Sequence, residues 1–511
     1  MRRPLIALAA ATATSAATLV LAAPPAQAVD RIDTQRLRET VTVGGILGHA
    51  RVLQRIANEH GGTRASGTPG FYRSAEYVEQ RLLAAGYETR SQYFTFPYFQ
   101  ELVPPALSQV SPVATDYDTA TLQYSGSGDV TGQLVPTEDI VIPPSDTVSS
   151  SSGCEPADFV AASDSAPQVA LIQRGTCTFE QKAANAQAAG YDAVVIFNEG
   201  QEGRQELLNG TLGRTFTLPV VGVSFQDGQR LYDAARSGAV TVRVTTSTEN
   251  RTATTRNVIA ETPGGDRDKV VVVGAHLDSV QEGPGINDNG SGTGAVLEIA
   301  EQMAELEITP RQKVRFAFWG AEENGLLGSK HYVAGLSDDQ LGRIYANLNF
   351  DMLGSPNFAR FVYDGDGSSG ASEPGPPGSA QIERVFTRYF RGQDLASEPT
   401  PFNGRSDYGP FIAVGIPAGG LFSGAEGVKT AAQARRYGGT AGEAYDSCYH
   451  EACDTINNVS TRGLAELGDA AAHATLTLAL TRSGLFEDGS LRVQQAPAQR
   501  QVDHRGSQAV R

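Results

Sequence analysis

The run KVVVVGAH, residues 269–276, narrows the folds open to this chain more than any other stretch. A continuous apolar run of this length is typical of a parallel strand that is buried on both faces. It ends at His276, and a glycine-rich loop and the amphipathic stretch TGAVLEIAEQMAEL, which has apolar residues at helical spacing, come next. The order strand, loop, helix predicts an α/β fold with a mixed, mainly parallel central sheet that is flanked by helices.

Further elements of this kind lie on both sides of that run. The runs KVRFAFWGAEE, residues 313–323, and YANLNFDML, residues 345–353, predict two more strands, and LAELGDAAAHATLTLAL, residues 464–480, predicts a closing helix. Between residues 47 and 87, two amphipathic stretches around the loop TRASGTPG predict a pair of helices.

The segment between about residues 97 and 249 has a different texture, with short β-rich runs, spacers of Ser, Thr, Gly and Pro, and one predicted helix. Within it, residues 169–173, 180–189 and 193–198 are expected as a strand, a helix and a strand. No position there combines histidine with carboxylates, so we expect an inserted β-rich domain without catalytic residues.

The first 28 residues have a basic start, an apolar run and the ending Ala26-Gln27-Ala28, which is typical of a secretory signal peptide. The alternative is a membrane anchor, but Thr and Ser interrupt the run and it is shorter than the ~20 residues that span a bilayer. Removal of this segment takes away two Arg and no acid, so the net charge moves from −16 to −18. This charge disfavours nucleic acid and anionic membranes as partners, and we expect a secreted monomer.

In an exported protein the four cysteines are expected to form disulfides, because disulfides persist outside the cytosol. Three pairings are possible, and we expect the two local ones, Cys154 with Cys177 and Cys448 with Cys453. A zinc site made of the cysteines is disfavoured, since the sequence has no C-x-x-C spacing.

Polar side chains follow the predicted strands at the point where each strand ends. His276 follows the first strand, Glu322 and Glu323 follow the second, and Asp351 follows the third. The carboxyl ends of parallel strands meet at one edge of a sheet, where ligands bind. The glycines between His276 and Asp288 permit close approach of the backbone, so this loop is expected to bring Asp288 beside His276.

Nitrogen and carboxylate ligands without thiolates suit a hydrolytic zinc or a similar divalent ion. Because this edge offers more ligands than one catalytic ion needs, we expect two ions bridged by a carboxylate. In the pair Glu322-Glu323, one side chain can bind metal while the other acts as a general base. Asp278 is placed to accept a hydrogen bond from the second nitrogen of His276.

Each of these residues has an ordinary structural alternative when taken alone. Asp288 or Asp351 could cap a helix, and a Glu-Glu pair is commonly a solvated turn. A second ion needs another histidine, and the candidates are His331, His450 and His473. We expect His450, because the predicted Cys448–Cys453 bridge would hold its loop. By contrast, the sequence around His331 is typical of a helix surface, and the sequence around His473 is typical of a packed helix.

Six motifs in order resemble the M28 family of co-catalytic di-zinc aminopeptidases, in particular those of the secreted Streptomyces type. They are GAHLDSV, GINDNGSGTGAVLE, WGAEENGLLGSK, LNFDMLGSPN, GRSDYGPF and CYHEACD. The segments QRGTCTF and AAGYDAVVIFN resemble a protease-associated (PA) domain. The resemblance implies a zinc-dependent exopeptidase fold with a signal peptide at 1–28, a peptidase domain at 29–98 and 250–486, an inserted PA domain at 99–249 and a disordered tail at 487–511.

The resemblance also implies a role for each site residue. His276 and Asp351 would bind one zinc ion, Glu323 and His450 the other, and Asp288 both. Glu322 would be the general base, Tyr449 would hydrogen-bond the developing oxyanion, and Arg405 would contact substrate. The expected reaction is hydrolysis of the first peptide bond of a substrate with a free amino terminus, with large apolar first residues such as Leu preferred.

One departure from the family concerns calcium, which activates some relatives through acidic residues of the last helix. Asp469 is present, but the position four residues before it is Ala465, which makes a calcium site doubtful. Three alternatives stay open: a carboxypeptidase or glutaminyl cyclase on the same scaffold, a binding protein without catalysis, and a structural metal protein. The complete ligand set and the free base beside Glu323 favour the aminopeptidase.

Overall fold

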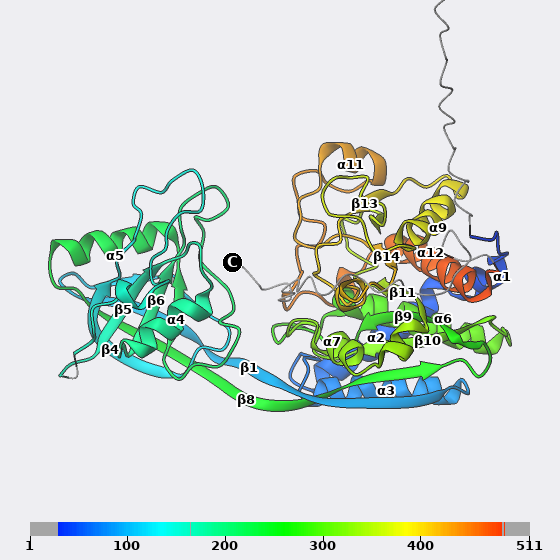
Figure 1. The fold of residues 1–511 in the computed structure, drawn as a ribbon, viewed down its shortest axis with the longest axis horizontal. Helices are drawn as coiled ribbons and strands as arrows, with labels where there is room; N and C mark the ends of the chain where they lie inside the picture. Colours follow the sequence, from blue (N-terminus) through cyan, green and yellow to red (C-terminus); the bar gives the residue numbers. More distant parts are fainter. Residues whose placement is uncertain (1–28, 164, 483–484, 486–511) are drawn as a thin grey trace, which may run out of the picture.

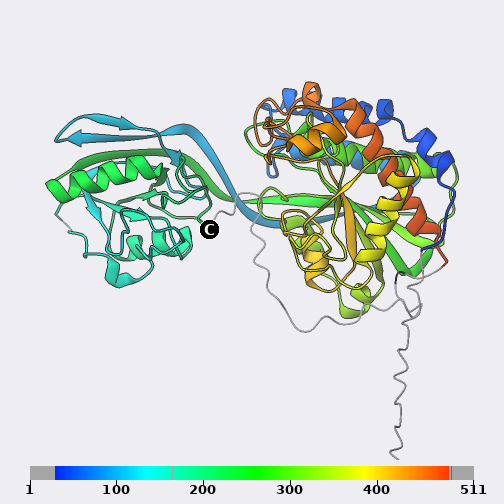
Figure 2. The ribbon, with the colours of Figure 1, turned by 90° about the horizontal axis from the view of Figure 1, so that it is seen from above.

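The computed structural model describes residues 29–163, 165–482 and 485. Figure 1 shows two lobes side by side, joined by the long antiparallel strands β1 (Glu88–Ser111) and β8 (Thr241–Glu261). Figure 2 shows the same connection from above. The segments predicted as a signal peptide and a tail, 1–28 and 487–511, lie outside the described residues.

The larger lobe is built on the mainly parallel part of a mixed sheet. The neighbours β10, β9, β11 and β14 are parallel, while β8 and β12 flank them in antiparallel pairing. This arrangement confirms the predicted fold class. The strands are β9 (Asp266–His276), β10 (Gln312–Trp319), β11 (Ile344–Phe350), β12 (Phe361–Tyr363), β13 (Glu398–Thr400) and β14 (Ala418–Phe422).

Helices cover both faces of this sheet, which explains why the β9 run is apolar throughout. Val271 and Val273 face the core that is formed with the longer helices, whereas Val270 and Val272 face a second core that includes Tyr332. The first face carries α1 (Gln35–Thr40), α2 (Val43–Glu59), α3 (Pro69–Ala84), α6 (Gly292–Glu305), α9 (Ser379–Gly392) and α12 (Thr461–Leu480). The second carries α7 (Leu327–Ala334), α8 (Asp338–Gly342) and α10 (Gly409–Ala413), and α11 (Ala431–Tyr437) and the 3-10 turn Ile456–Asn458 complete the lobe.

The smaller, inserted lobe is an extension of the same sheet, beyond β8. Its strands β4 (Gly128–Pro136), β5 (Gln168–Gln173), β6 (Ala193–Phe197) and β7 (Val220–Val223) are parallel neighbours, and β3 (Ala120–Thr121) ends the strand order. The expected strand, helix and strand are confirmed as β5, α4 (Phe179–Ala188) and β6. β2 (Thr115–Tyr117) pairs with β1, and the 3-10 turn Pro156–Asp158 precedes β5.

Two expectations for this lobe were wrong. A second helix, α5 (Phe225–Ser237), packs Leu231 against the sheet face opposite α4, although only one helix was expected. The segment also does not consist only of short strands, because β1 and β8 pair from Glu88 opposite Glu261 to Ser111 opposite Thr241. The expected boundaries at 98/99 and 249/250 fall inside these two strands. The sequence does not indicate this long strand pair, because Pro residues in β1 and Thr residues in β1 and β8 interrupt the alternation of apolar and polar residues.

Both expected disulfides are present. Cys154 is bonded to Cys177 in the inserted lobe, and Cys448 is bonded to Cys453 in the larger lobe.

The packing of β10 leads to a stability prediction. Phe316 is fully buried and makes an edge contact with Tyr87 at a ring-centroid distance of 5.6 Å. We expect Phe316→Ala to lower the free energy of unfolding by about 3–5 kcal/mol, because it leaves a cavity in the core. Val113→Ala, at a side chain that is 66% exposed, is the control and should change it by less than about 0.5 kcal/mol. Urea unfolding followed by circular dichroism would measure both, and equal values would contradict the expected packing.

Candidate active site

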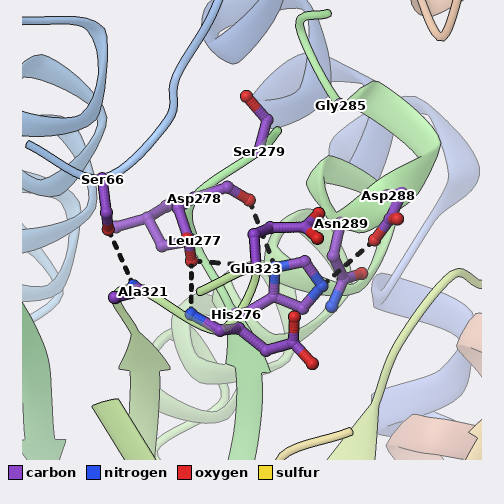
Figure 3. A network of polar contacts seen from close by, with 12 residues as sticks. Ser66, His276, Leu277, Asp278, Ser279, Gly285, Asp288, Asn289, Ala321 and Glu323 are labelled. Carbon is purple, nitrogen blue, oxygen red and sulfur yellow. Dashed lines mark hydrogen bonds and ion pairs between the residues drawn. The ribbon is translucent and has the colours of Figure 1, made fainter. Parts of the chain in front are cut away.

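The structure brings the predicted side chains together at one edge of the sheet. His276 is the last residue of β9, Glu322 and Glu323 lie just beyond β10, and Asp351 directly follows β11. Because β10, β9 and β11 are parallel neighbours, their carboxyl ends lie side by side. Figure 3 shows His276 with Asp288 and Glu323 around it.

The glycine-rich loop after β9 is shaped by tight backbone contacts. Gly285 has φ +58°, and a Cβ atom there would lie 2.3 Å from the carbonyl oxygen of Asp288. A Cβ atom at Gly283 would lie 2.3 Å from the carbonyl oxygen of Glu451. The loop therefore needs glycine for close approach as well as for its left-handed conformation. It leads into the turn Ile286–Ser291, whose backbone is non-helical at Asp288, with φ −106° and ψ 91°.

Two residues that the sequence analysis did not single out hold this loop. Arg64, which is fully buried, donates hydrogen bonds to the carbonyl oxygens of Pro284 at 2.8 Å, of Gly285 at 2.6 Å and of Leu277. Asp454 accepts hydrogen bonds from the backbone N–H groups of Asn287 and Asp288 at 2.8 and 2.9 Å. Arg64 lies in the TRASGTPG loop and Asp454 follows Cys453, so their positions gave no local signal of this role.

Asp288 lies between two histidines. Its Oδ1 atom is 3.1 Å from Nε2 of His276, and its Oδ2 atom is 3.2 Å from Nε2 of His450. Each histidine has one further carboxylate, since Asp351 Oδ1 lies 3.2 Å from His276 Nε2 and Glu323 Oε2 lies 3.1 Å from His450 Nε2. The five side chains thus form two groups that share Asp288.

His450 comes from a short loop at the far end of the chain. The Cys448–Cys453 disulfide closes this loop, and His450 has φ +60°. The ring of Tyr449 stacks on that of His450 at a centroid distance of 3.8 Å. The other two candidates lie elsewhere: His331 is exposed on α7, and His473 makes a contact of 2.8 Å with the hydroxyl of Thr34.

The expected role of Asp278 needs a correction. Nδ1 of His276 is 3.2 Å from the backbone carbonyl oxygen of Asp278, whereas the nearest carboxylate oxygen of Asp278 is 3.9 Å away. That carboxylate oxygen instead accepts a hydrogen bond from the N–H group of Glu322 at 3.2 Å. The imidazole is therefore oriented by the Asp278 backbone, and the Asp278 side chain positions Glu322.

A charge imbalance marks the site as a place for cations. Four buried or nearly buried carboxylates, those of Asp288, Glu322, Glu323 and Asp351, face two histidines. Burial by itself would lower the pKa of His276, but the charges of Asp351 and Glu322 raise this pKa well above its ordinary value. Burial also raises the pKa of Glu322 well above its ordinary value.

The donor atoms themselves also fit metal ligation. In the part of the chain that the structure describes, Oε1 of Glu323 is buried and has no hydrogen-bond partner, and the contacts of His450 Nε2 are with two carboxylate oxygens. One ligand atom each from His276, Asp288 and Glu323 lies within 4.8 Å of the others. Ser406 donates a hydrogen bond of 2.6 Å to Asp351 Oδ2, which is the kind of outer contact that orients a ligating carboxylate. A divalent cation would coordinate these atoms and neutralise the excess negative charge.

A pocket with an aromatic wall opens beside these residues and has a volume of about 70 Å³. Arg405 lies at its rim, where it donates a 2.6 Å hydrogen bond to Glu426 and lies 3.4 Å from the hydroxyl of Tyr449. The structure therefore places Tyr449 and Arg405 at the same pocket as the metal-site residues. Its remaining lining includes Met352, Tyr363, Tyr408 and Phe422.

Protein-family models match both lobes of the chain. Peptidase family M28 matches residues 257–475, and the PA domain matches residues 130–231. An aminopeptidase of Pseudomonas aeruginosa strain PAO1 is 45% identical over 452 residues, which cover 87% of this chain and 82% of that protein. Leucine aminopeptidase 2 of Trichophyton equinum is 38% identical over 467 residues, with coverage of 90% and 89%.

Solved structures agree as well. An aminopeptidase from Aneurinibacillus sp. strain AM-1 has a TM-score of 0.68 at 26% identity and covers 91% of this chain and 98% of its own. BSAP, a zinc aminopeptidase from Bacillus subtilis, has a TM-score of 0.60 at 25% identity, with coverage of 85% and 94%. The fold and the carboxylate-histidine site define a metal-dependent peptidase. The chain belongs to peptidase family M28, carries an inserted PA domain and is an aminopeptidase.

The contacts of Arg64 lead to a second prediction. Arg64→Met would leave the buried carbonyl oxygens of Leu277 and Pro284 without this donor, whereas the Gly285 carbonyl would keep the N–H group of Gly290 at 3.0 Å. Each buried carbonyl without a donor costs about 1–3 kcal/mol. We expect the free energy of unfolding to fall by about 2 kcal/mol or more, with a matched loss of metal binding. Arg73→Met, at a side chain that is 62% exposed, should leave both unchanged. Denaturant unfolding and metal titration by calorimetry measure the two quantities, and a stable variant with normal metal binding would exclude this role.

Proposed function

We propose that this protein is a secreted aminopeptidase that uses two zinc ions and prefers large apolar first residues. The observation that carries the two-ion proposal is the position of Asp288, one oxygen of which faces His276 and the other His450. The relative BSAP is named as a zinc enzyme, and nitrogen and carboxylate donors suit zinc. His276 and Asp351 would hold one ion, Glu323 and His450 the other, and Asp288 both. When bound, the ions would act as Lewis acids toward the scissile carbonyl and the attacking water.

The protein side chains supply the proton transfers and the positioning. Glu322, whose pKa is raised by burial, would take a proton from the attacking water and later deliver it to the leaving amine. The Tyr449 hydroxyl would donate a hydrogen bond to the developing oxyanion. Arg405, held by Glu426 at 2.6 Å, would contact the substrate at the pocket rim. The carboxylates of the site would hold the free α-amine, which requires an unblocked amino terminus.

The preference for apolar residues rests on the pocket wall. Met352, Tyr363, Tyr408 and Phe422 line it, and Tyr363 and Tyr408 have ring centroids 4.5 Å apart. Burial of an apolar side chain against this wall stabilises the complex in proportion to the area removed from water. Leucine is therefore preferred over glycine or an acidic residue.

Secretion rests on the signal-like segment 1–28 and on the two disulfides, which persist outside the cytosol. Among the helices of residues 29–482, none has the length and apolar character that crossing a bilayer requires. We also propose the domain division given above, with the peptidase at 29–98 and 250–486 and the PA domain at 99–249.

The proposed function is tested by release of leucine from Leu-Ala-Ala-NH₂ and from its N-acetylated form. We expect release only from the free peptide, with loss of activity after dialysis against a chelator and recovery when two zinc ions per chain are added back. Mass spectrometry of bound metal gives the stoichiometry. Equal cleavage of the acetylated peptide would exclude an aminopeptidase, and full recovery with one ion per chain would exclude the second ion.

The role of Glu322 has its own test. We expect Glu322→Gln to retain its zinc and its melting temperature but to lose turnover by a factor on the order of 10² or more, as for removal of a general base. Glu443→Gln, at an exposed position of the same lobe, is the matched control and should be as active as the natural chain. Unchanged turnover in the Glu322 variant would show that another group accepts the proton.

A further inference from the structure

A second cleft opens next to the metal-site residues, between the two lobes. It has a volume of about 350 Å³, against about 70 Å³ for the aromatic pocket, and the two share Glu323 as their one common lining residue. One wall comes from the inserted lobe, with Thr121 and Gln123, and the other from the loop after β9, with Glu282. Glu101 of β1 completes it. Figure 1 shows the lobes facing each other above β1 and β8.

The lining of this cleft is acidic. Besides Glu323, which the proposed function assigns to a metal ion, it includes the carboxylates of Glu101 and Glu282, and the described residues that form it include no Lys, Arg or His. Glu101 and Glu282 are exposed, and neither belongs to a salt bridge of the described chain. Several amide side chains, which can bond a peptide backbone, line the rest. They are Gln123, Asn209, Gln281 and Asn324.

Strand β3 of the inserted lobe forms part of the same wall. β3 ends the strand order of the sheet, and its residues Ala120 and Thr121 line the cleft. A peptide bound beside the metal-site residues would therefore contact both lobes.

We propose that this cleft binds the part of the substrate that follows the scissile bond and that it selects basic residues at the second and third positions. The proposal rests on the aminopeptidase site described above, because the aromatic pocket takes the first residue and Glu323 lies where the pocket and the cleft meet. The PA domain then forms one wall of the substrate-binding cleft. Glu101 and Glu282 attract Lys or Arg side chains of the substrate.

The test compares initial rates of leucine release from three amidated peptides, Leu-Lys-Lys-Ala, Leu-Glu-Glu-Ala and Leu-Ala-Ala-Ala. Two opposite charges in contact through water attract with an energy that corresponds to about fivefold in rate or affinity. We expect kcat/KM to be about tenfold or more higher for the Lys peptide than for the Glu peptide at low salt. This ratio should shrink in 0.5 M NaCl, because salt screens charges at the surface.

Variants of the cleft residues test whether the preference for Lys over Glu peptides arises in the cleft. Glu282→Gln should lower the ratio several-fold, and Glu101→Gln combined with Glu282→Gln should bring it close to one. Glu206→Gln, at an exposed acid of the inserted lobe outside the cleft, removes the same charge and should keep the ratio, which separates a local effect from that of the net charge of −16. The melting temperature of each variant reports on folding.

Leucine p-nitroanilide, which has no residues after the scissile bond, separates this proposal from the proposed function. Failure of the natural chain to hydrolyse it would overturn the proposed function itself. Hydrolysis of the anilide together with equal rates for the Lys and Glu peptides would overturn only the role of the cleft. A ratio that falls equally in the Glu206 variant would do the same.

Discussion

Asp288 connects the two halves of the candidate metal centre, and its position depends on hydrogen bonds from residues far away in the sequence. Asp454 accepts from the backbone of the turn that carries Asp288, and Arg64 binds the carbonyl oxygens of the preceding loop. Further long-range hydrogen bonds join the same turn to the segment after β11, from Asn289 to the Phe350 carbonyl and from the Gly354 N–H group to Asn287. The accuracy of the site thus comes from the buried polar framework behind it.

The same framework bears on the electrostatics of the site. Four carboxylates crowd around two histidines, which is unfavourable unless cations compensate the charge. Arg64 supplies a positive charge behind the loop, and burial lowers its pKa to about 10 while the charges of Asp278 and Asp454 act in the opposite direction. Proposed zinc ions would supply the rest. Binding of the proposed ions would therefore add to the stability of this lobe.

The inserted lobe is tied to the catalytic lobe through β1 and β8, which continue one sheet into the other. This connection places β3 and Gln123 opposite the loop that follows β9, so the insertion contributes to the surface next to the metal site. Sequence patterns indicated a separate domain but no such contact. The Pro-containing strand β1 also concealed that the two lobes share strands, because its composition is not typical of one long strand.

Local features of the sequence determined the strands β9, β10 and β11, the helices that follow the core pattern, and the polar residues at the strand ends, because periodicity and strand termini are visible over a few residues. They also indicated His450, since a disulfide of neighbouring cysteines marks its loop. The hydrogen bond from His276 to the Asp278 backbone, the roles of Arg64 and Asp454, and the cleft between the lobes were decided only by the tertiary structure. Those contacts join residues that are distant in the chain, and their geometry depends on how the whole sheet and both lobes pack.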